Sequence, residues 1–490
     1  MSTLTFLFRR LDRVVWLRRG LRGEVRPATG HEAGCLVHFE GGRRSRLRLG
    51  AALVGLVAAT LAPASPNLVP APRQAKPILL SGGRVVPVSG PALETGDVLL
   101  VDGRIAQVAA RITPPAGAEV IDVKGRSVYP GLIAAHTQLG LMEIGSARAT
   151  NDVAEYGPLN PNARTQTALN PDSEHLPVTR ANGILTALVT PADRPGTGAP
   201  LNLLAGTSTL IRLDGWTWED LTVRPAVAMH LHWPTMRLSG GGTPAAVATQ
   251  QKNLDAQVRR IDEAFAAARA YAQAKADGGR VEDTDLRWEA MLPVLRGEQR
   301  VFVHADEVKQ IRSALAFARR QKIALTLVGG LDAWRVADEL KAANVPVIIS
   351  GTERLPARRD DDYEAAYANP ARLHAAGVTF CIAGLGQGDL GHERNLGVHA
   401  ARAAAHGLPR DIALRSVTLS AAEILGVGAE LGSIEPGKRA TLIVTDGDPL
   451  EIPTQVQLAF IDGARIDLRS RHTQLYEKYN ERLRRVQGTR

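Results

Sequence analysis

The sequence predicts an α/β protein whose main part is a (β/α)8 TIM barrel. Between residues 127 and 383, seven short apolar runs typical of strands alternate with stretches rich in Ala, Glu and Arg that are typical of helices. This alternation favours a parallel barrel. A doubly wound open sheet is the alternative, but no Gly-rich phosphate loop follows the first run. The runs are 127–135, 184–189, 226–232, 300–304, 324–328, 346–350 and 379–383.

The positive charge of the chain is concentrated at its amino terminus. The formal net charge is +9, but residues 1–50 contain 11 Arg, no Lys and 4 acidic residues, which leaves +2 for the other 440 residues. A nearly neutral body predicts no nucleic-acid partner. The chain has two cysteines, Cys35 and Cys381, and no Cys-x-x-Cys motif. The sequence therefore gives no sign of a structural zinc site built from cysteines.

Residues 43–64 show the order of regions found in a secretory signal peptide. Arg43-Arg44-Ser45-Arg46 precedes small and apolar residues from Leu49 to Leu61, and Ala62-Pro63-Ala64 provides an A-x-A-like cleavage site. The apolar run is too short to span a bilayer comfortably, although an uncleaved membrane anchor is the alternative. We therefore expect a periplasmic or secreted protein with no stable membrane span after cleavage.

A signal peptide normally begins close to residue 1, whereas this one begins near residue 40. Residues 1–36 lack a clear periodic pattern, so we expect translation to start downstream, near Val37. Sequencing the amino terminus of the exported protein tests this expectation. The predicted leader therefore covers residues 1–64, and the Pro-rich residues 65–76 are expected to form a linker.

Segments typical of β structure lie on both sides of the predicted barrel. Residues 78–122 contain short β-like runs separated by Gly and Pro, with Asp102-Gly103 as a hairpin signal. Residues 432–463 contain Gly432-Ser433-Ile434-Glu435-Pro436-Gly437, followed by a second group of β-like runs. Residues 471–490 alternate basic, acidic and aliphatic side chains, which predicts a solvated helical tail.

Two segments of the sequence, residues 130–138 and 432–444, resemble conserved segments of the amidohydrolase superfamily. Residues 130–138, Pro-Gly-Leu-Ile-Ala-Ala-His-Thr-Gln, are similar to the Pro-Gly-Leu-Ile-Asp-x-His-x-His of that superfamily's first barrel strand. Residues 432–444 are similar to its closing segment, Gly-x-Leu-x-Pro-Gly-x-x-Ala-Asp-Leu-Val. The resemblance covers residues 77–470 and implies that 77–128 and 430–470 pair into a composite β-sandwich beside a barrel at 129–429.

The resemblance also implies a site for zinc or another divalent metal at the carboxyl ends of the barrel strands. Family members use two His on strand 1, a carboxylated Lys or a Glu on strand 4, one His each on strands 5 and 6, and an Asp on strand 8. His136 and His304 match the family pattern, whereas Gln138 stands in place of the second His of strand 1. The strand 6 His and the strand 8 Asp have no counterpart in residues 325–330 and 380–385.

Another His-x-His pair, His230 and His232, lies on the expected fourth strand. Residues two apart on a strand share a face. Both imidazoles could therefore join His136 and His304 in a four-histidine site that suits zinc. The alternative is that these histidines line a pocket or form local hydrogen bonds. His175, in the loop 140–183 expected over the barrel mouth, is a candidate pocket residue or is simply exposed.

Two functions are compatible with these patterns. The first is an exported amidohydrolase-type enzyme, similar to imidazolonepropionase-like and dipeptidase-like branches, that hydrolyses a non-peptide C–N bond with a metal-activated water. Its catalysis is expected to be impaired or altered, because the strand 8 Asp that receives the proton has no counterpart. The second is a non-catalytic barrel serving as a ligand-binding or assembly module. Both imply a small-molecule substrate or ligand, and the resemblance is compatible with a homodimer.

Overall fold

The computed structural model describes residues 69–194, 201–238, 243–278, 280–386 and 390–488. These residues all belong to the unit Ala64–Arg490. The predicted signal peptide at 43–64, the predicted downstream start of translation and the first part of the linker lie outside the described residues. Every helix in the described ranges is too short or too polar to cross a bilayer.

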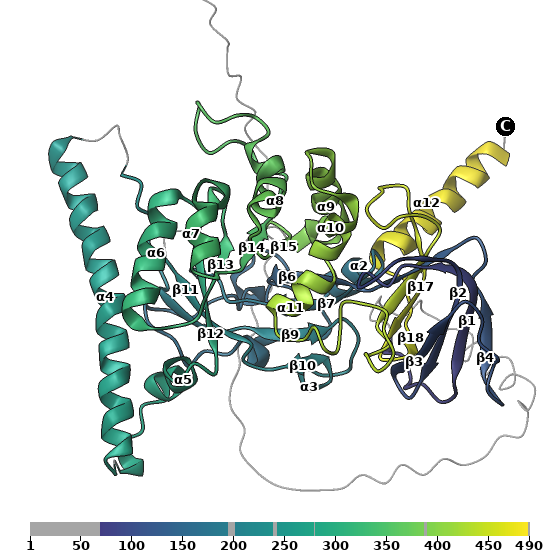
Figure 1. The fold of residues 1–490 in the computed structure, drawn as a ribbon, viewed down its shortest axis with the longest axis horizontal. Helices are drawn as coiled ribbons and strands as arrows, with labels where there is room; N and C mark the ends of the chain where they lie inside the picture. Colours follow the sequence, from purple (N-terminus) through teal and green to yellow (C-terminus); the bar gives the residue numbers. More distant parts are fainter. Residues whose placement is uncertain (1–68, 195–200, 239–242, 279, 387–389, 489–490) are drawn as a thin grey trace, which may run out of the picture. The chain divides into compact units, whose positions relative to one another are not determined.

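The segments that flank the predicted barrel form one eight-stranded sheet (Figure 1). Its order is β18-β17-β16-β5-β1-β2-β3, and β4 pairs with β1. Asp102 and Gly103, with φ of 49° and 77°, make the tight turn between β2 and β3, as the hairpin signal predicts. The strands are β1 (Ile78–Val85), β2 (Leu93–Val101), β3 (Arg104–Ala109), β4 (Glu119–Asp122), β5 (Ser127–Pro130), β16 (Leu442–Thr445), β17 (Val456–Ile461) and β18 (Ala464–Arg465).

The middle of the chain is a mixed α/β structure whose strands form two further sheets. One has the order β10-β9-β7-β6 and the other β15-β14-β13-β12-β11-β8. Ser208 separates β8 from β9, so the chain passes directly from one sheet into the other. The strands are β6 (Leu132–Thr137), β7 (Ile184–Val189), β8 (Leu204–Thr207), β9 (Thr209–Arg212), β10 (Thr222–Arg224), β11 (Ala228–His232), β12 (Arg300–Ala305), β13 (Leu325–Gly329), β14 (Val347–Ser350) and β15 (Phe380–Ala383).

This arrangement departs from an all-parallel closed barrel in two ways. The segment β8–β9 runs antiparallel to both of its neighbours, β11 and β7. The strands β6 and β15 contact each other, but no ladder of hydrogen bonds joins them within the described residues. The connection at 190–203 contains no described helix, and an antiparallel return needs none.

In Figure 1, helices α6 to α10 lie on one side of these two sheets, and α3 and α5 lie on the other. Helix α6 illustrates why they form: Glu307 and Gln310 make a capping box, and Lys322 ends the helix in the left-handed conformation. The helices are α2 (His175–Arg180), α3 (Trp218–Leu221), α4 (Pro244–Ala276), α5 (Leu286–Leu295), α6 (Val308–Gln321), α7 (Ala337–Ala342), α8 (Ala365–Ala376), α9 (Leu396–Ala405), α10 (Arg410–Ser416), α11 (Leu419–Ile424) and α12 (Arg471–Gly488).

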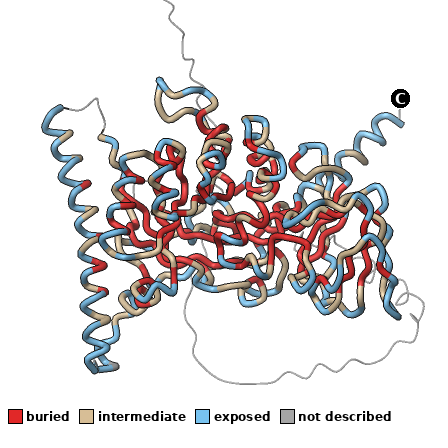
Figure 2. Tube along the Cα trace, viewed as in Figure 1, coloured by how far each residue is buried: buried red, intermediate tan, exposed pale blue. Residues whose placement is uncertain are grey.

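A buried apolar core lies between the strands (Figure 2). Alternate side chains of the strands, such as Leu188, Phe302 and Ile348, pack in this core together with residues of α11. Cys381 belongs to the same core, and burial raises the pKa of its thiol, so it is an inert packing residue. The residues that follow the carboxyl ends of the parallel strands line a pocket instead.

Candidate active site

A polar pocket of about 670 Å³ opens over the carboxyl ends of the parallel strands. Its lining comes from residues at or just after the ends of β6, β7, β11, β12, β13, β14 and β15. Sites of α/β barrels are built at this end because the strand-to-helix connections converge there. The polar or strand-end lining residues include His136, Asp193, Arg194, His232, Trp233, Thr235, Gln257, His304, Asp306, Glu307, Gln310, Gly329, Ser350, Arg354 and Leu385.

Three histidines, His136, His232 and His304, line this pocket, and a fourth, His230, is buried next to His304. The strands β11 and β12 pair in register with His232 opposite His304, and these two rings stack with centroids 4.1 Å apart. The centroid of the His304 ring lies 5.1 Å from that of His230 and 5.2 Å from that of His136. A register shift between Ala134 and Thr137 interrupts the pairing of β6 just where His136 lies. The structure therefore brings together the four histidines that the sequence analysis combined.

The hydrogen bonding within the cluster is incomplete. His230 Nδ1 lies 2.8 Å from His304 Nε2, so one of these nitrogens donates a proton to the other. By contrast, His136 Nδ1, His230 Nε2 and His232 Nε2 are buried without a hydrogen-bond partner in the described residues. Buried polar atoms are rarely left unpaired, because the loss of hydration is costly. These three nitrogens are the atoms that a bound ligand would satisfy.

Burial keeps these imidazoles neutral. It lowers the pKa of His136 and of His232 to about 4, and it lowers the pKa of His230 and His304 well below the ordinary value of 6.5. The positive form of neighbouring histidines adds to the effect at His136, whereas the negative charge of Asp193 opposes it at His232. All four rings are therefore uncharged at neutral pH, which is the form that binds metals.

The donor chemistry of this cluster fits a divalent cation, but the arrangement of the donors does not yet match. Neutral imidazoles suit zinc, and three of them have an unpartnered nitrogen. No set of three or more His, Cys, Asp or Glu side chains in the described part of the chain is arranged to hold a metal ion. His230 and His304 point nitrogens at each other rather than at a shared point. Binding a cation between them would require this contact to open.

Two other predicted site residues lie elsewhere. Gln138 is buried, and its main-chain carbonyl oxygen accepts a hydrogen bond from the main-chain amide of Leu141 at 3.0 Å. His175 begins α2, with Nε2 3.2 Å from the carbonyl oxygen of Glu143. Neither residue is among the described residues that line the histidine pocket.

Gly384 follows the last strand, where family members carry an Asp. A buried carboxylate, that of Glu393, lies beside this glycine. A Cβ atom at Gly384, directly after β15, would lie 2.9 Å from Oε1 and 3.0 Å from Oε2 of Glu393. Glu393 is 3% exposed and comes from the short helix Leu390–Asn395. It is not among the residues that line the pocket. Its position nevertheless leaves no room for a side chain at Gly384.

Two residues that sequence reasoning missed contact or influence the cluster. Gly386 has φ of +75°, and a Cβ there would lie 2.5 Å from His136 Nε2, so only Gly fits against the ring. Arg354, beyond β14, has Nη1 3.5 Å from Asp306 Oδ1, and its charge contributes to the lowered pKa of His136. The Gly-rich stretch after the last strand was a signal that could have drawn attention to Gly386. Nothing in the local sequence indicated Arg354.

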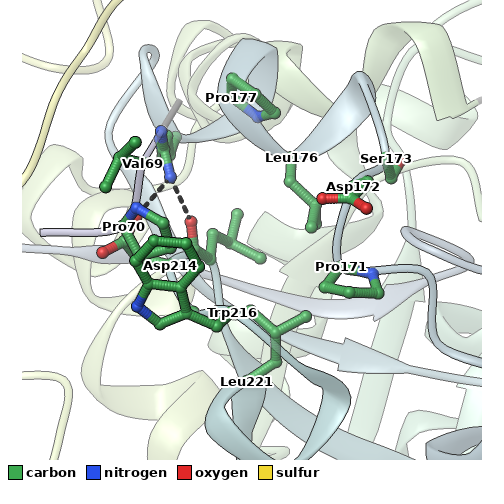
Figure 3. Close-up of a pocket in the computed structure, with 13 residues that line it drawn as sticks. Val69, Pro70, Pro171, Asp172, Ser173, Leu176, Pro177, Asp214, Trp216 and Leu221 are labelled. Carbon is green, nitrogen blue, oxygen red and sulfur yellow. Dashed lines mark hydrogen bonds and ion pairs between the residues drawn. The ribbon is translucent and has the colours of Figure 1, made fainter. Parts of the chain in front are cut away.

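A separate pocket of about 150 Å³ shares no lining residue with the histidine pocket (Figure 3). Its wall contains a buried ion pair, in which Arg180 Nη1 lies 2.6 Å from Asp214 Oδ1. Asp214 Oδ2 also accepts a hydrogen bond from the Ala71 amide at 2.9 Å. The pair thus attaches the middle of the predicted linker, at Ala71, to α2 and to the segment after β9.

Comparisons with known proteins complete this description. Residues 128–465 match the family model described as "Amidohydrolase family". The chain is 25% identical over 402 residues to amidohydrolase tasK of Hapsidospora irregularis, covering 75% of this chain but only 39% of that protein. It is 49% identical over 63 residues to a dihydroorotase of Pelotomaculum thermopropionicum, covering 13% of this chain and 14% of that enzyme. The structure of an amidohydrolase from Thermotoga maritima superposes with a TM-score of 0.69 at 24% identity, covering 80% of this chain and 100% of that one.

Proposed function

Because this chain belongs to the amidohydrolase family, we propose that it hydrolyses a C–N bond in a small polar molecule. The substrate class would be an amide, a cyclic amide or a dipeptide-like compound. The observation that carries the proposal is the cluster of His136, His230, His232 and His304 at a polar pocket over the strand ends. Similarity to tasK supports the general class of reaction, although the chain spans less than half of that protein.

Once the contact between His230 and His304 opens, the four imidazoles would be the ligands for the divalent cation that this chemistry needs. Such a cation supplies an activated water at neutral pH. Asp193 and Asp306 line the pocket and could accept a proton from that water. The amide of Leu331 donates to Asp306 Oδ1 at 3.2 Å, which fixes the orientation of this carboxylate. Arg354 would orient a carbonyl or carboxylate group of the substrate, since guanidinium groups bind such oxygens directionally.

Metal content and turnover together test the proposal. Elemental analysis of the purified protein, after expression with added zinc, is expected to give stoichiometric metal. His136→Ala and His230→Ala should each lose the metal, whereas His175→Ala, outside the pocket, should retain it. Metal-loaded protein is then assayed against amides, cyclic amides and dipeptides. Protein that carries no metal under these conditions would contradict the proposed site.

A non-catalytic binding module is the second candidate. The hydrogen bond between His230 and His304 favours it, because that bond already engages one nitrogen of each ring. The absence of a side chain at Gly384 also favours it, since this position carries no carboxylate to receive a proton. In that case the protein would contain no metal and show no turnover. It would still bind a small polar ligand, which would raise the melting temperature with the logarithm of the ligand concentration once the site is mostly filled.

We also propose finer assignments for fold, location and assembly. The strand circuit from β6 to β15 would be the (β/α)8 barrel at 129–429, with an open seam between these two strands. The eight-stranded sheet would belong to a composite β-sandwich built from 77–128 and 430–470. Export through the segment 43–64 and a homodimeric assembly remain proposals. Amino-terminal sequencing and light scattering of the exported protein test them.

A further inference from the structure

The last helix, α12, contacts α2 but is otherwise open to solvent along most of its length. It covers Arg471–Gly488, and none of its residues is buried. Figure 1 draws it in yellow, running away from the eight-stranded sheet, and Figure 2 shows it mostly exposed. Isolated helices of this length are marginal in water, and this one contains Tyr, Thr, Asn and Val rather than a run of Ala. A helix of this kind is usually stabilised by contact along its apolar face.

The apolar residues of α12 form one stripe. Leu475, Tyr479, Leu483 and Val486 follow one another at intervals of four, four and three, which places them on one side of the helix. Tyr476 widens the stripe and is 71% exposed. The other four side chains are exposed by 39% to 56%. The stripe is therefore uncovered along the full length of the helix.

The charges of α12 are separated around its axis. At about 100° per residue, Arg471, Lys478 and Arg482 lie along one edge of the apolar stripe. The two acidic residues, Glu477 and Glu481, fall on the opposite side. There Glu481 pairs with Arg484 at 3.2 Å and with Arg485 at 2.8 Å. The uncovered face is therefore apolar, rich in Tyr and positively charged, with its negative charges turned away.

We propose that α12 binds to the surface of an anionic lipid bilayer. The stripe would enter the interfacial region, where Tyr side chains are favoured, and the cationic edge would contact the headgroups. A second copy of the helix fits less well, because it would bring the same cations to the contact. An acidic protein would need a complementary groove for this convex face, whereas a bilayer contacts it along its whole length.

Vesicle flotation of the full chain tests this proposal. The chain is expected to float with phosphatidylcholine vesicles that contain about one third phosphatidylglycerol, and not with phosphatidylcholine alone. Raising the salt concentration to about 1 M should abolish binding, because the Debye length falls to about 3 Å. Arg482→Glu should weaken binding on the order of tenfold. The matched control is Arg484→Glu, which makes the same charge change on the opposite side and should have a much smaller effect.

A second pair of variants examines the apolar stripe. Tyr479→Gln should weaken binding to anionic vesicles, whereas Asn480→Gln, one residue along but off the stripe, should not. Because α12 buries no side chain, the variants should keep the melting temperature of the unchanged protein. Three results would overturn the proposal: no flotation with anionic vesicles, equal flotation with neutral ones, or equal effects of Arg482→Glu and Arg484→Glu. Binding to soluble polyglutamate without binding to vesicles would do the same.

Discussion

His230 and His304 are hydrogen-bonded to each other, with Nδ1 of the first 2.8 Å from Nε2 of the second. The two residues come from neighbouring strands, β11 and β12, and both rings are held by burial in the neutral form. A neutral imidazole has one N–H group and one lone pair, so the tautomer of one ring fixes the tautomer of the other. His230 and His304 therefore behave as one coupled pair rather than as two separate donors.

A double-mutant cycle should reveal this coupling. Replacing His230 or His304 by Leu leaves a buried nitrogen on the other ring unpaired, which should lower the free energy of unfolding by about 1–3 kcal/mol. The double variant should be more stable than the sum of the single changes predicts, by at least about 0.5 kcal/mol. Urea denaturation in the presence of a chelator measures each term. Strictly additive effects would show that the two rings do not interact.

The contact between Gly386 and His136 predicts that alanine destabilises the protein more at position 386 than at a glycine with open space around it. Gly386→Ala places a Cβ 2.5 Å from His136 Nε2 at φ of +75°. Gly117 has the same φ with no atom within 4 Å, so Gly117→Ala carries the backbone strain alone. We expect a loss of about 1 kcal/mol for Gly117→Ala and at least about 2 kcal/mol for Gly386→Ala. Only Gly386→Ala should also weaken zinc binding, measured by calorimetry. Equal losses of stability would mean that the ring moves aside freely.

The buried histidines should make the metal-free protein sensitive to acid. In the unfolded chain a histidine titrates near 6.5, whereas His136 and His232 titrate at about 4 in the fold. Between these values the unfolded chain binds more protons, so the free energy of unfolding falls as the pH drops from 6.5 towards 4. Each of the two histidines should account for about 3 kcal/mol of this loss. His232→Gln should show a shallower pH dependence in chelator-treated urea titrations; an unchanged slope would contradict the assignment.

Removing only one partner of the ion pair between Arg180 and Asp214 should lower the free energy of unfolding strongly. Burial lowers the pKa of Arg180 and raises that of Asp214, so desolvation opposes both charges despite their 2.6 Å contact. Asp214→Ala would leave the guanidinium buried without its partner, which should destabilise the protein by about 3–5 kcal/mol. The double variant Arg180→Met/Asp214→Leu should recover most of this loss in thermal unfolding. A double variant as unstable as Asp214→Ala would point to packing rather than charge.

Asp214 also anchors the amide of Ala71, which gives a second readout. In Asp214→Asn the side chain can still accept that hydrogen bond, whereas in Asp214→Ala it cannot. Limited trypsin digestion should therefore cut after Arg73 faster in Asp214→Ala than in Asp214→Asn. Equal rates would show that residues 69–71 are held by other contacts.

Local patterns predicted most strands because a buried strand leaves a short apolar run in the sequence. In the run Val301-Phe302-Val303-His304, Val301 and Val303 pack in one buried core, whereas Phe302 packs in another on the face that ends in His304; β12 ends one residue beyond it. The segment 204–212 was not predicted as a strand, since Gly206 and Ser208 interrupt its apolar run. Its direction could not be read either, because an apolar strand looks the same in both orientations. The antiparallel pairing of β8 and β9 becomes visible only from their neighbours.

The candidate site was predictable only where a strand ends in a chemically distinctive residue. His136, His230, His232 and His304 satisfy this condition, and the structure brings them together. Gln138 was chosen by the same reasoning and His175 by its place in the loop over the expected barrel mouth, but neither is among the described residues that line the pocket. Gly386 meets His136 across 250 positions of the chain, and such a contact leaves no trace in local spacing. Arg354 was missed for the same reason.

The antiparallel turn from β7 to β8 has a consequence for how this protein could adapt. Residues 190–203 join the two strands at the pocket, and Pro191, Asp193 and Leu201 from this connection form part of its wall. The β8 side of the turn is fixed by Leu203, whose carbonyl oxygen accepts a hydrogen bond from the His232 amide at 2.8 Å. Insertions or deletions inside this connection would alter the breadth of the pocket while the histidine-bearing strands keep their register. The size of the molecule that the pocket admits could therefore change here while the histidine cluster stays as it is.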